Sequence, residues 1–192
     1  GHFYAGEDKA IELINQLPKH KLVILDKLIP RVTGNYAAVF QNFEHDIFRT
    51  LHEVAPRLQR YQRLKIIFPH ETYHPKAILN GFQRFVIENG IRGYVVPDIA
   101  THEIEPGDAY LTLMEQDLVT LIKRVKGMEL RVGEEIGILS YNESPLKEIL
   151  LDGVSVISTD FSEMGRRAAE MILAKEVRHV ENPFRLILRN SL

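Results

Sequence analysis

The sequence predicts an α/β fold with mostly parallel strands. Short apolar runs alternate along the chain with helical patterns of about 10 to 15 residues, which is the order expected of βαβ units. In the last third, the apolar runs at residues 136–139 and 154–157 each end in a polar cluster, and a helical segment follows each cluster. Because open α/β sheets bind ligands at the carboxyl ends of their strands, the sequence predicts a small-molecule pocket first and catalytic chemistry only second.

The chain begins with one helix and two short strands. Residues 7–17 place apolar side chains at the i, i+3, i+4, i+7 spacing of one helical face, and Pro18 ends the pattern. The apolar runs at residues 22–25 and 36–40 predict buried strands, and Asp26 follows the first of them directly. A carboxylate is therefore expected at a strand end.

A second helix, a strand and a third helix follow. Residues 45–58 form an amphipathic pattern, although Pro56 predicts a kink or an earlier end of that helix. Residues 64–68 predict a strand, and Pro75 suits the first turn of a helix that runs to about Gly90.

The second half continues the alternation of strands and helices. Strands are predicted at residues 93–96, 109–113, 136–139, 154–157 and 184–188, and helices at residues 118–125, 146–150 and 162–175.

Composition excludes several classes of protein. The chain has 192 residues, of which 45% are hydrophobic and 26% charged, so it is typical of a globular protein and not of a disordered chain. A formal net charge of −2 gives no overall electrostatic attraction to nucleic acid. The absence of cysteine excludes disulfides and thiolate metal sites. No apolar run approaches the roughly 18 residues of a membrane span, and the first residues lack the pattern of a signal peptide.

Two motifs have plain structural interpretations. His70 and His74 spell H-E-x-x-H, which binds zinc only when both histidines lie on one helix. Pro69 and Pro75 flank the motif, so we expect His70 in a loop, His74 at a helix entrance and no metal site. The basic cluster at residues 57–65 is expected to be a solvated helix end, where cations offset the helix dipole.

Five segments, in chain order, carry a resemblance to a known family. Residues 22–26 (Leu-Val-Ile-Leu-Asp), the pair Gly81–Phe82, and residues 137–145 (Gly-Ile-Leu-Ser-Tyr-Asn-Glu-Ser-Pro) are similar to strand ends and a helix of LacI/GalR-type effector domains. Residues 154–173 resemble that family's crossover, and residues 182–192 resemble its terminal strand with the closing Arg-x-Ser. The C-terminal third resembles GntR-type repressors that carry such a domain, including fucose-operon repressors.

The resemblance implies a periplasmic-binding-protein-like fold of two Rossmann-like lobes with parallel sheets, joined by three crossings. Residues 1–40 and 161–180 would be the remnant of an N-terminal lobe, and residues 41–160 and 181–192 would form the C-terminal lobe. The first lobe would be incomplete, because two β-α units and a winged helix-turn-helix normally come before it. We therefore expect an amino-terminally truncated effector domain, and hence association, disorder over residues 1–40 or completion by another chain.

The resemblance also implies a sugar pocket. Asp26 and Asn142 match strand-end positions, Glu143 follows Asn142, and Phe161 matches a crossover aromatic that stacks on a pyranose. Nine residues are expected to bind the ligand: Asp26, Tyr73, His74, Lys76, Gln116, Asp117, Asn142, Glu143 and Phe161. Paired donors and acceptors beside one flat apolar surface suit a sugar.

Some alternatives stay open. The family usually has an arginine where this chain has Ile78, so either Tyr73, His74 or Lys76 supplies that polar contact or the ligand differs. Asp26 and Asn142 could simply cap the turns after their strands, because Asx side chains satisfy backbone groups there. Phe161 could be a core residue.

The expected function is that of a ligand-binding domain of a cytoplasmic transcriptional repressor. It would sense a small sugar, such as L-fucose or a related monosaccharide, and would act as a homodimer on operator DNA through a winged helix outside this chain. No enzyme activity, cofactor, metal or membrane partner is expected. The alternatives are a periplasmic sugar-binding protein of a transporter and, less favoured, a sugar-acting α/β enzyme.

Overall fold

The structure is a computed structural model that describes residues 6–192, and the chain divides into two compact units. Unit 1 comprises Gly1–Asn42 and Thr159–Phe184, and unit 2 comprises Phe43–Ser158 and Arg185–Leu192. The chain therefore passes between the units three times. Residues 1–5, which the expected first lobe includes, lie outside the described residues. That unit 1 is the remnant of a larger lobe remains a prediction.

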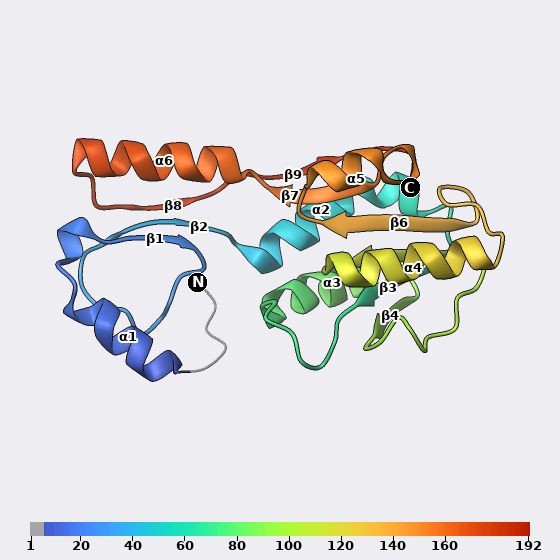
Figure 1. Cartoon of the computed structure of the whole chain (residues 1–192), viewed down its shortest axis with the longest axis horizontal. Coiled ribbons are helices and arrows are strands. Elements are labelled where there is room, and N and C mark those ends of the chain that lie inside the picture. The colour runs from blue at the N-terminus through green and yellow to red at the C-terminus, as the bar shows by residue number, and fades with distance from the viewer. Residues whose placement is uncertain (1–5) are drawn as a thin grey trace. The chain divides into compact units, whose positions relative to one another are not determined.

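Unit 1 is a small parallel sheet with a helix on each face. Its strands β1 (Val23–Asp26), β2 (Ala37–Phe40) and β8 (His179–Glu181) lie in the order β1-β2-β8, with parallel pairing throughout. The helices are α1 (Glu7–Gln16) and α6 (Phe161–Ala174), and α6 runs along the sheet in Figure 1.

The alternation of side chains along β2 explains this arrangement. Ala38 packs in one cluster with Ile11 of α1, whereas Ala37 and Val39 pack with Met164 and other residues of α6. Successive side chains of a strand point to opposite faces, so an uninterrupted apolar strand requires cover on both sides.

Unit 2 contains a six-stranded sheet in the order β4-β3-β5-β6-β7-β9. All pairings from β4 to β7 are parallel. The strands are β3 (Arg63–Ile67), β4 (Gly93–Val96), β5 (Asp108–Thr112), β6 (Ile136–Tyr141), β7 (Ser155–Thr159) and β9 (Phe184–Ile187). The predicted α/β class with parallel sheets is confirmed.

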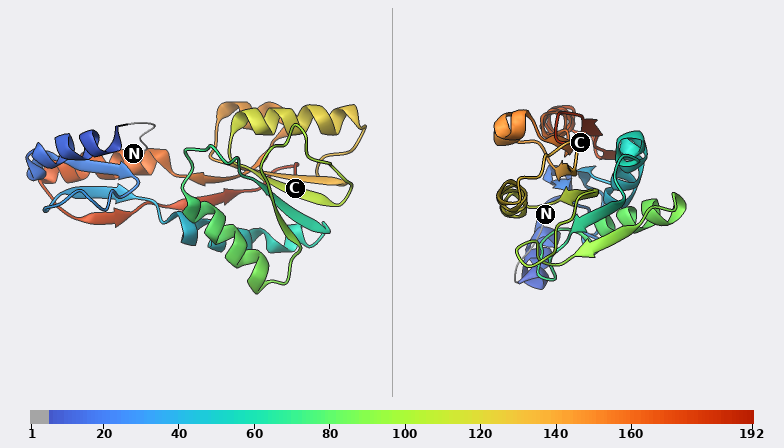
Figure 2. Two further views of the ribbon diagram at one scale, coloured as in Figure 1. Left: turned by 90° about the horizontal axis from the view of Figure 1, so that it is seen from below. Right: turned by 90° about the vertical axis from the view of Figure 1, so that its right-hand side faces the viewer.

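Helices cover both faces of this sheet. They are α2 (Phe43–Leu58), α3 (Lys76–Glu88), α4 (Glu115–Gly127) and the short α5 (Pro145–Ile149). The left view of Figure 2 shows α2 and α3 on one side of the sheet and α4 on the other.

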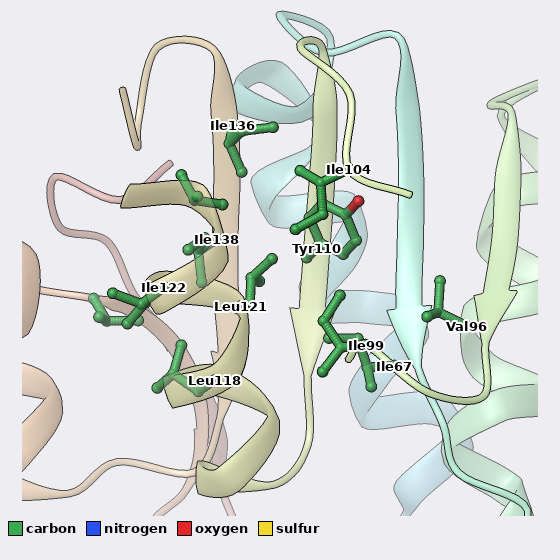
Figure 3. Packing of buried hydrophobic residues seen from close by; sticks show 12 residues of the cluster. Ile67, Val96, Ile99, Ile104, Tyr110, Leu118, Leu121, Ile122, Ile136 and Ile138 are labelled. Atoms are coloured by element: carbon green, nitrogen blue, oxygen red, sulfur yellow. The ribbon is translucent and has the colours of Figure 1, made fainter. Parts of the chain in front are cut away.

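The core beneath α4 shows how the apolar face of a helix packs against the sheet. Leu118, Leu121 and Ile122 point from α4 onto Tyr110 of β5 and Ile138 of β6, and all five side chains are buried (Figure 3). On the opposite face, a Cβ on Gly81 would lie 2.4 Å from the carbonyl oxygen of Glu44, so the crossing of α2 and α3 requires glycine.

Three details differ from the sequence-based expectations. Strand β8 was not predicted, because its residues are mostly exposed and show no apolar run. Helix α2 continues past Pro56 to Leu58, so the expectation of an earlier end is wrong, and the kink stays a prediction. The basic cluster is not a solvated helix end throughout, because Lys65 lies buried in β3 and pairs with Asp108 at 2.7 Å.

Candidate functional site

A pocket of about 430 Å³ lies in unit 2 at the carboxyl ends of β3, β5 and β6, which are neighbours in the sheet. Tyr73 and His74 come from the loop after β3, and residues 113–116 follow β5. Residues 141–143 close β6, and Lys147 comes from α5. The location is the one where open α/β sheets bind ligands.

Five of the nine predicted site residues line this pocket. They are Tyr73, His74, Gln116, Asn142 and Glu143. They come from three separate segments after β3, β5 and β6, so their grouping follows from the parallel order of the strands and not from sequence proximity.

One wall of the pocket is aromatic. The rings of Tyr73 and His74 lie 4.4 Å apart at an interplanar angle of 33°, and His74 meets Tyr141 edge-on at 5.8 Å. Tyr73 is 43% exposed, so its ring is open to a ligand. Flat apolar faces of this kind stack on other flat or weakly polar surfaces.

The H-E-x-x-H motif contributes to this wall and not to a zinc site. Helix α3 begins at Lys76, so neither His70 nor His74 is helical and the motif lacks the geometry that zinc binding requires. Among residues 6–192, no group of three His, Asp or Glu side chains is placed to hold a metal ion.

Asn142 occupies a strained turn between β6 and α5. Its φ is +60°, in the left-handed region that asparagine tolerates better than most residues. Its amide N–H donates to the carbonyl of Ile157 at 2.7 Å. This backbone bond continues the pairing of β6 with β7 into the turn, and the residue also lines the pocket. That the Asn142 side chain caps the turn stays a prediction.

Glu143 is held by groups from three parts of unit 2. Its Oε1 accepts the backbone N–H of Ser144 at 2.8 Å, and its Oε2 accepts from Nη2 of Arg189 at 2.5 Å. Its own N–H donates to Oγ of Ser158 at 2.9 Å. Two hydrogen bonds thus fix the direction of the carboxylate, and a preset direction lowers the entropic cost of binding.

Lys147 is the buried charged residue of the pocket that sequence reasoning missed. It is only 3% exposed, and its Nζ donates to the carbonyl oxygens of Tyr141 at 2.8 Å and Asn142 at 2.7 Å. Burial lowers the pKa of Lys147, and the nearby carboxylates of Glu115 and Glu143 oppose that effect.

The hydrophobic pattern of α5 predicts that its apolar residues are buried and that Lys147 is exposed, but the structure shows the reverse. Leu146 and Ile149 are 43% and 75% exposed, while the lysine between them is buried. Only the position of Lys147 just beyond a strand end and its polar cluster could have singled it out.

Two predicted residues of unit 2 lie outside the set that lines the pocket. Lys76 is exposed at the first position of α3. One carboxylate oxygen of Asp117 is buried without a hydrogen-bond partner among the described residues, and burial and the negative charge of Asp98 raise its pKa.

Two further predicted residues, Asp26 and Phe161, belong to unit 1. Asp26 ends β1 with φ +76°, and its carboxylate accepts a hydrogen bond from Nε2 of Gln41 at 2.5 Å. Phe161 begins α6 and is 52% exposed, so it is not a core residue. Asn142 belongs to unit 2, and the convergence of these three residues on one cleft stays a prediction.

Unit 1 has a cavity of its own, of about 470 Å³. Leu22, Val23 and Ala37 line it at the amino ends of β1 and β2, together with Met171 and Ile172 of α6. Since ligands of parallel sheets bind at the opposite, carboxyl ends, the pocket in unit 2 is the better candidate for a ligand site.

The fold is a parallel α/β architecture with a pocket at the carboxyl ends of its strands. The sequence profile of the periplasmic binding protein-like domain matches residues 58–192. The chain belongs to this family of periplasmic binding protein-like domains. No curated protein sequence matches the chain.

Solved structures of LacI-type regulators share the fold. A LacI family transcriptional regulator from Lactobacillus casei with bound glucose matches with a TM-score of 0.73 and 13% identity, over 97% of this chain and 75% of that chain. The Escherichia coli transcriptional repressor ascG matches with a TM-score of 0.72 and 12% identity, over 98% of this chain and 75% of that chain.

The Lac repressor bound to ONPG in the repressed state matches with a TM-score of 0.67 and 15% identity. The match covers 88% of this chain, and the chain spans 56% of the length of that repressor chain. At these identities the likeness establishes the fold, and the function must be argued from the site.

Proposed function

We propose that the chain is the ligand-binding domain of a transcriptional regulator that senses a small sugar. The observation that carries the proposal is the pocket of unit 2, where an aromatic wall faces amide, carboxylate and ammonium groups at strand ends. A sugar needs this combination of one flat apolar surface and several directed polar partners. The structural relatives, which are regulators and include one with bound glucose, support the same class.

The finer proposal follows the resemblance to GntR-type repressors of fucose operons. The effector would be L-fucose or a related monosaccharide, and the regulator would be a cytoplasmic homodimer whose winged helix lies outside these residues. The sugar would control DNA binding only if its affinity differs between the DNA-binding and the released states. With a net charge of −2, the 192-residue chain itself is not expected to bind operator DNA specifically.

Titration calorimetry with neutral monosaccharides, L-fucose included, tests the proposal. At least one sugar should bind, and Tyr73→Ala should weaken that binding by about 1 kcal/mol because a stacking surface is lost. Tyr94 is the matched control, since it is 48% exposed on β4 and does not line the pocket. Equal affinities of wild type, Tyr73→Ala and Tyr94→Ala, or no binding at all, would contradict the proposal.

The second candidate is a sugar-binding protein of a transporter, and the match to a periplasmic binding protein-like profile favours it. The coding sequence upstream of Gly1 discriminates the two: a winged helix supports the regulator, and a signal peptide supports transport. No helix among residues 6–192 is long and apolar enough to cross a membrane. A sugar-acting enzyme is the least supported, and chromatography of a sugar incubated with the protein tests it directly.

A further inference from the structure

The ammonium group of Lys147 has a hydrogen-bond donor to spare. A lysine ammonium carries three N–H donors, and two of them are used by the carbonyl oxygens of Tyr141 and Asn142. No other described residue accepts a hydrogen bond from it. The residue is only 3% exposed and lines the pocket, so an oxygen that satisfies the third donor must lie in the pocket. A buried, unsatisfied ammonium donor is costly, so a ligand oxygen that accepts from it gains a strong hydrogen bond.

The positive and negative charges of the side chains around this donor compensate each other. Three charged side chains line the pocket, namely Glu115, Glu143 and Lys147. The charge of Glu143 is already compensated by Arg189, which bonds to it. The charge of Lys147 is therefore left to be compensated by Glu115, an exposed residue in the first turn of α4 for which no salt bridge is formed among the described residues.

We propose that Lys147 and Glu115 form a charge-balanced recognition pair that selects a neutral polyol, a free sugar and not a phosphorylated or acidic one. A hydroxyl group can accept from the Lys147 ammonium and donate to the Glu115 carboxylate. An anionic group would gain the lysine but would meet the carboxylate of Glu115, which no arginine compensates among the described residues. This inference rests on the proposed function, since it assumes that the pocket binds a sugar.

Lys147 has hydrogen-bond partners within the protein and Glu115 forms no salt bridge among the described residues, so substitutions of the two residues are expected to affect stability differently. Replacing Lys147 leaves the carbonyl oxygens of Tyr141 and Asn142 without their partner, so Lys147→Met is expected to lower stability as well as affinity. Glu115→Gln removes the charge of an exposed side chain that forms no salt bridge among the described residues, and glutamine keeps its size and hydrogen-bonding capacity. Lys123→Met and Glu12→Gln are matched controls, since both residues are exposed and lie outside the pocket.

The experiment measures, on the full chain, the binding of neutral and anionic forms of the same sugars. The probes are D-glucose, D-galactose and L-fucose, set against D-glucuronate, D-galacturonate and the 6-phosphates of glucose and galactose. The wild type should bind its preferred neutral sugar at least about tenfold more tightly than any anionic counterpart. Glu115→Gln should reduce that preference roughly tenfold, and folded Lys147→Met should bind the neutral sugar about tenfold or more weakly.

Each outcome decides the matter. If an anionic sugar binds as tightly as the neutral one, or if Glu115→Gln leaves the preference unchanged, the recognition pair is wrong while sugar sensing stands. Unchanged affinity in a folded Lys147→Met variant also overturns it. If that variant fails to fold, the Glu115→Gln comparison decides alone. If no sugar of either kind binds, the proposed function fails and this inference falls with it.

Discussion

Nη2 of Arg189 lies 2.5 Å from Oε2 of Glu143, which links the last segment of the chain to the pocket. The same guanidinium donates from Nη1 to the carbonyl of Val154 at 2.8 Å, and the Arg189 amide donates to Oγ of Ser155 at 2.9 Å. The closing Arg-x-Ser thus supports both the edge of the sheet and the direction of a pocket carboxylate.

Arg189→Lys should lower the free energy of unfolding by about 1–3 kcal/mol, because a single ammonium cannot reproduce two directed guanidinium contacts. Arg178→Ala should change it by less than about 0.5 kcal/mol, since the Arg178 side chain is 63% exposed. Urea denaturation of both variants measures the difference. Equal losses would show that the contacts of Arg189 add nothing to stability.

Two substitutions of Asn142 distinguish its contribution to sugar binding from the effect of backbone strain on stability. The sequence alone predicts that Asn142→Ala weakens sugar binding and barely alters stability, but φ of +60° changes the second expectation. Alanine should cost about 1 kcal/mol of stability there, whereas Asn142→Gly should avoid the steric part of that cost. Both variants should weaken sugar binding by about 1–3 kcal/mol. Thermal melts and calorimetric titrations measure the two effects, and unchanged affinity in both variants would make Asn142 a turn residue only.

Asp108 should make the stability of unit 2 sensitive to acid. Burial opposes ionisation of Asp108, but hydrogen bonds from Lys65, the Glu105 amide and Arg63 outweigh it and lower its pKa. A carboxyl whose pKa is lowered by folding stabilises the fold above its unfolded pKa, near 4, and this contribution is lost as pH falls through the lower folded pKa.

Asp108→Asn should therefore reduce stability at neutral pH by about 3–5 kcal/mol, because the buried Lys65 loses its anionic partner, and should flatten the loss of stability below about pH 4. Asp8→Asn is the control, since the Asp8 side chain is 88% exposed. Urea denaturation between pH 7 and pH 3 gives the slopes. An unchanged acid slope in Asp108→Asn would refute the assignment.

Unit 1 should mediate self-association. Leu173 and Ile172 of α6 are 83% and 61% exposed, and Leu13 of α1 is 64% exposed. Strand β1 is an edge strand of its sheet, with Leu25 40% exposed. Exposed apolar groups and open strand edges recruit partners.

Ile172→Glu/Leu173→Glu should raise the dissociation constant of a dimer at least about tenfold, which is a loss of about 1.4 kcal/mol. Ile87→Glu is the matched control, because Ile87 is 78% exposed on α3 of unit 2. Sedimentation velocity over a range of concentrations measures the association. A wild-type monomer at every concentration would disprove the homodimer, and an equal effect of Ile87→Glu would place the interface elsewhere.

Much of the fold could be predicted from the sequence. Buried parallel strands appear as continuous apolar runs, and the helices that cover them show a regular apolar stripe. Site residues could be predicted where polar residues follow such an apolar run, as Asn142 and Glu143 do. Lys147 could not, because its role depends on the direction in which a short helix faces the end of β6. Glu115 was also missed, since its relation to Lys147 depends on the pairing of β5 with β6, which brings the segments after both strands to one pocket.

The three passages between the units have a consequence for biosynthesis. Domains usually fold one after another as the ribosome delivers them. Here Thr159–Phe184 completes unit 1, and Arg185–Leu192 completes unit 2, although most of unit 2 has been translated before either segment. Ser191 joins strands of unit 2 by donating from Oγ to the carbonyl of Ile138 at 2.6 Å and accepting from the Ser155 amide at 2.8 Å. Neither unit can therefore reach its final state on the ribosome before nearly the whole chain has emerged, and a nascent chain stalled at residue 158 would expose two unfinished sheets at once.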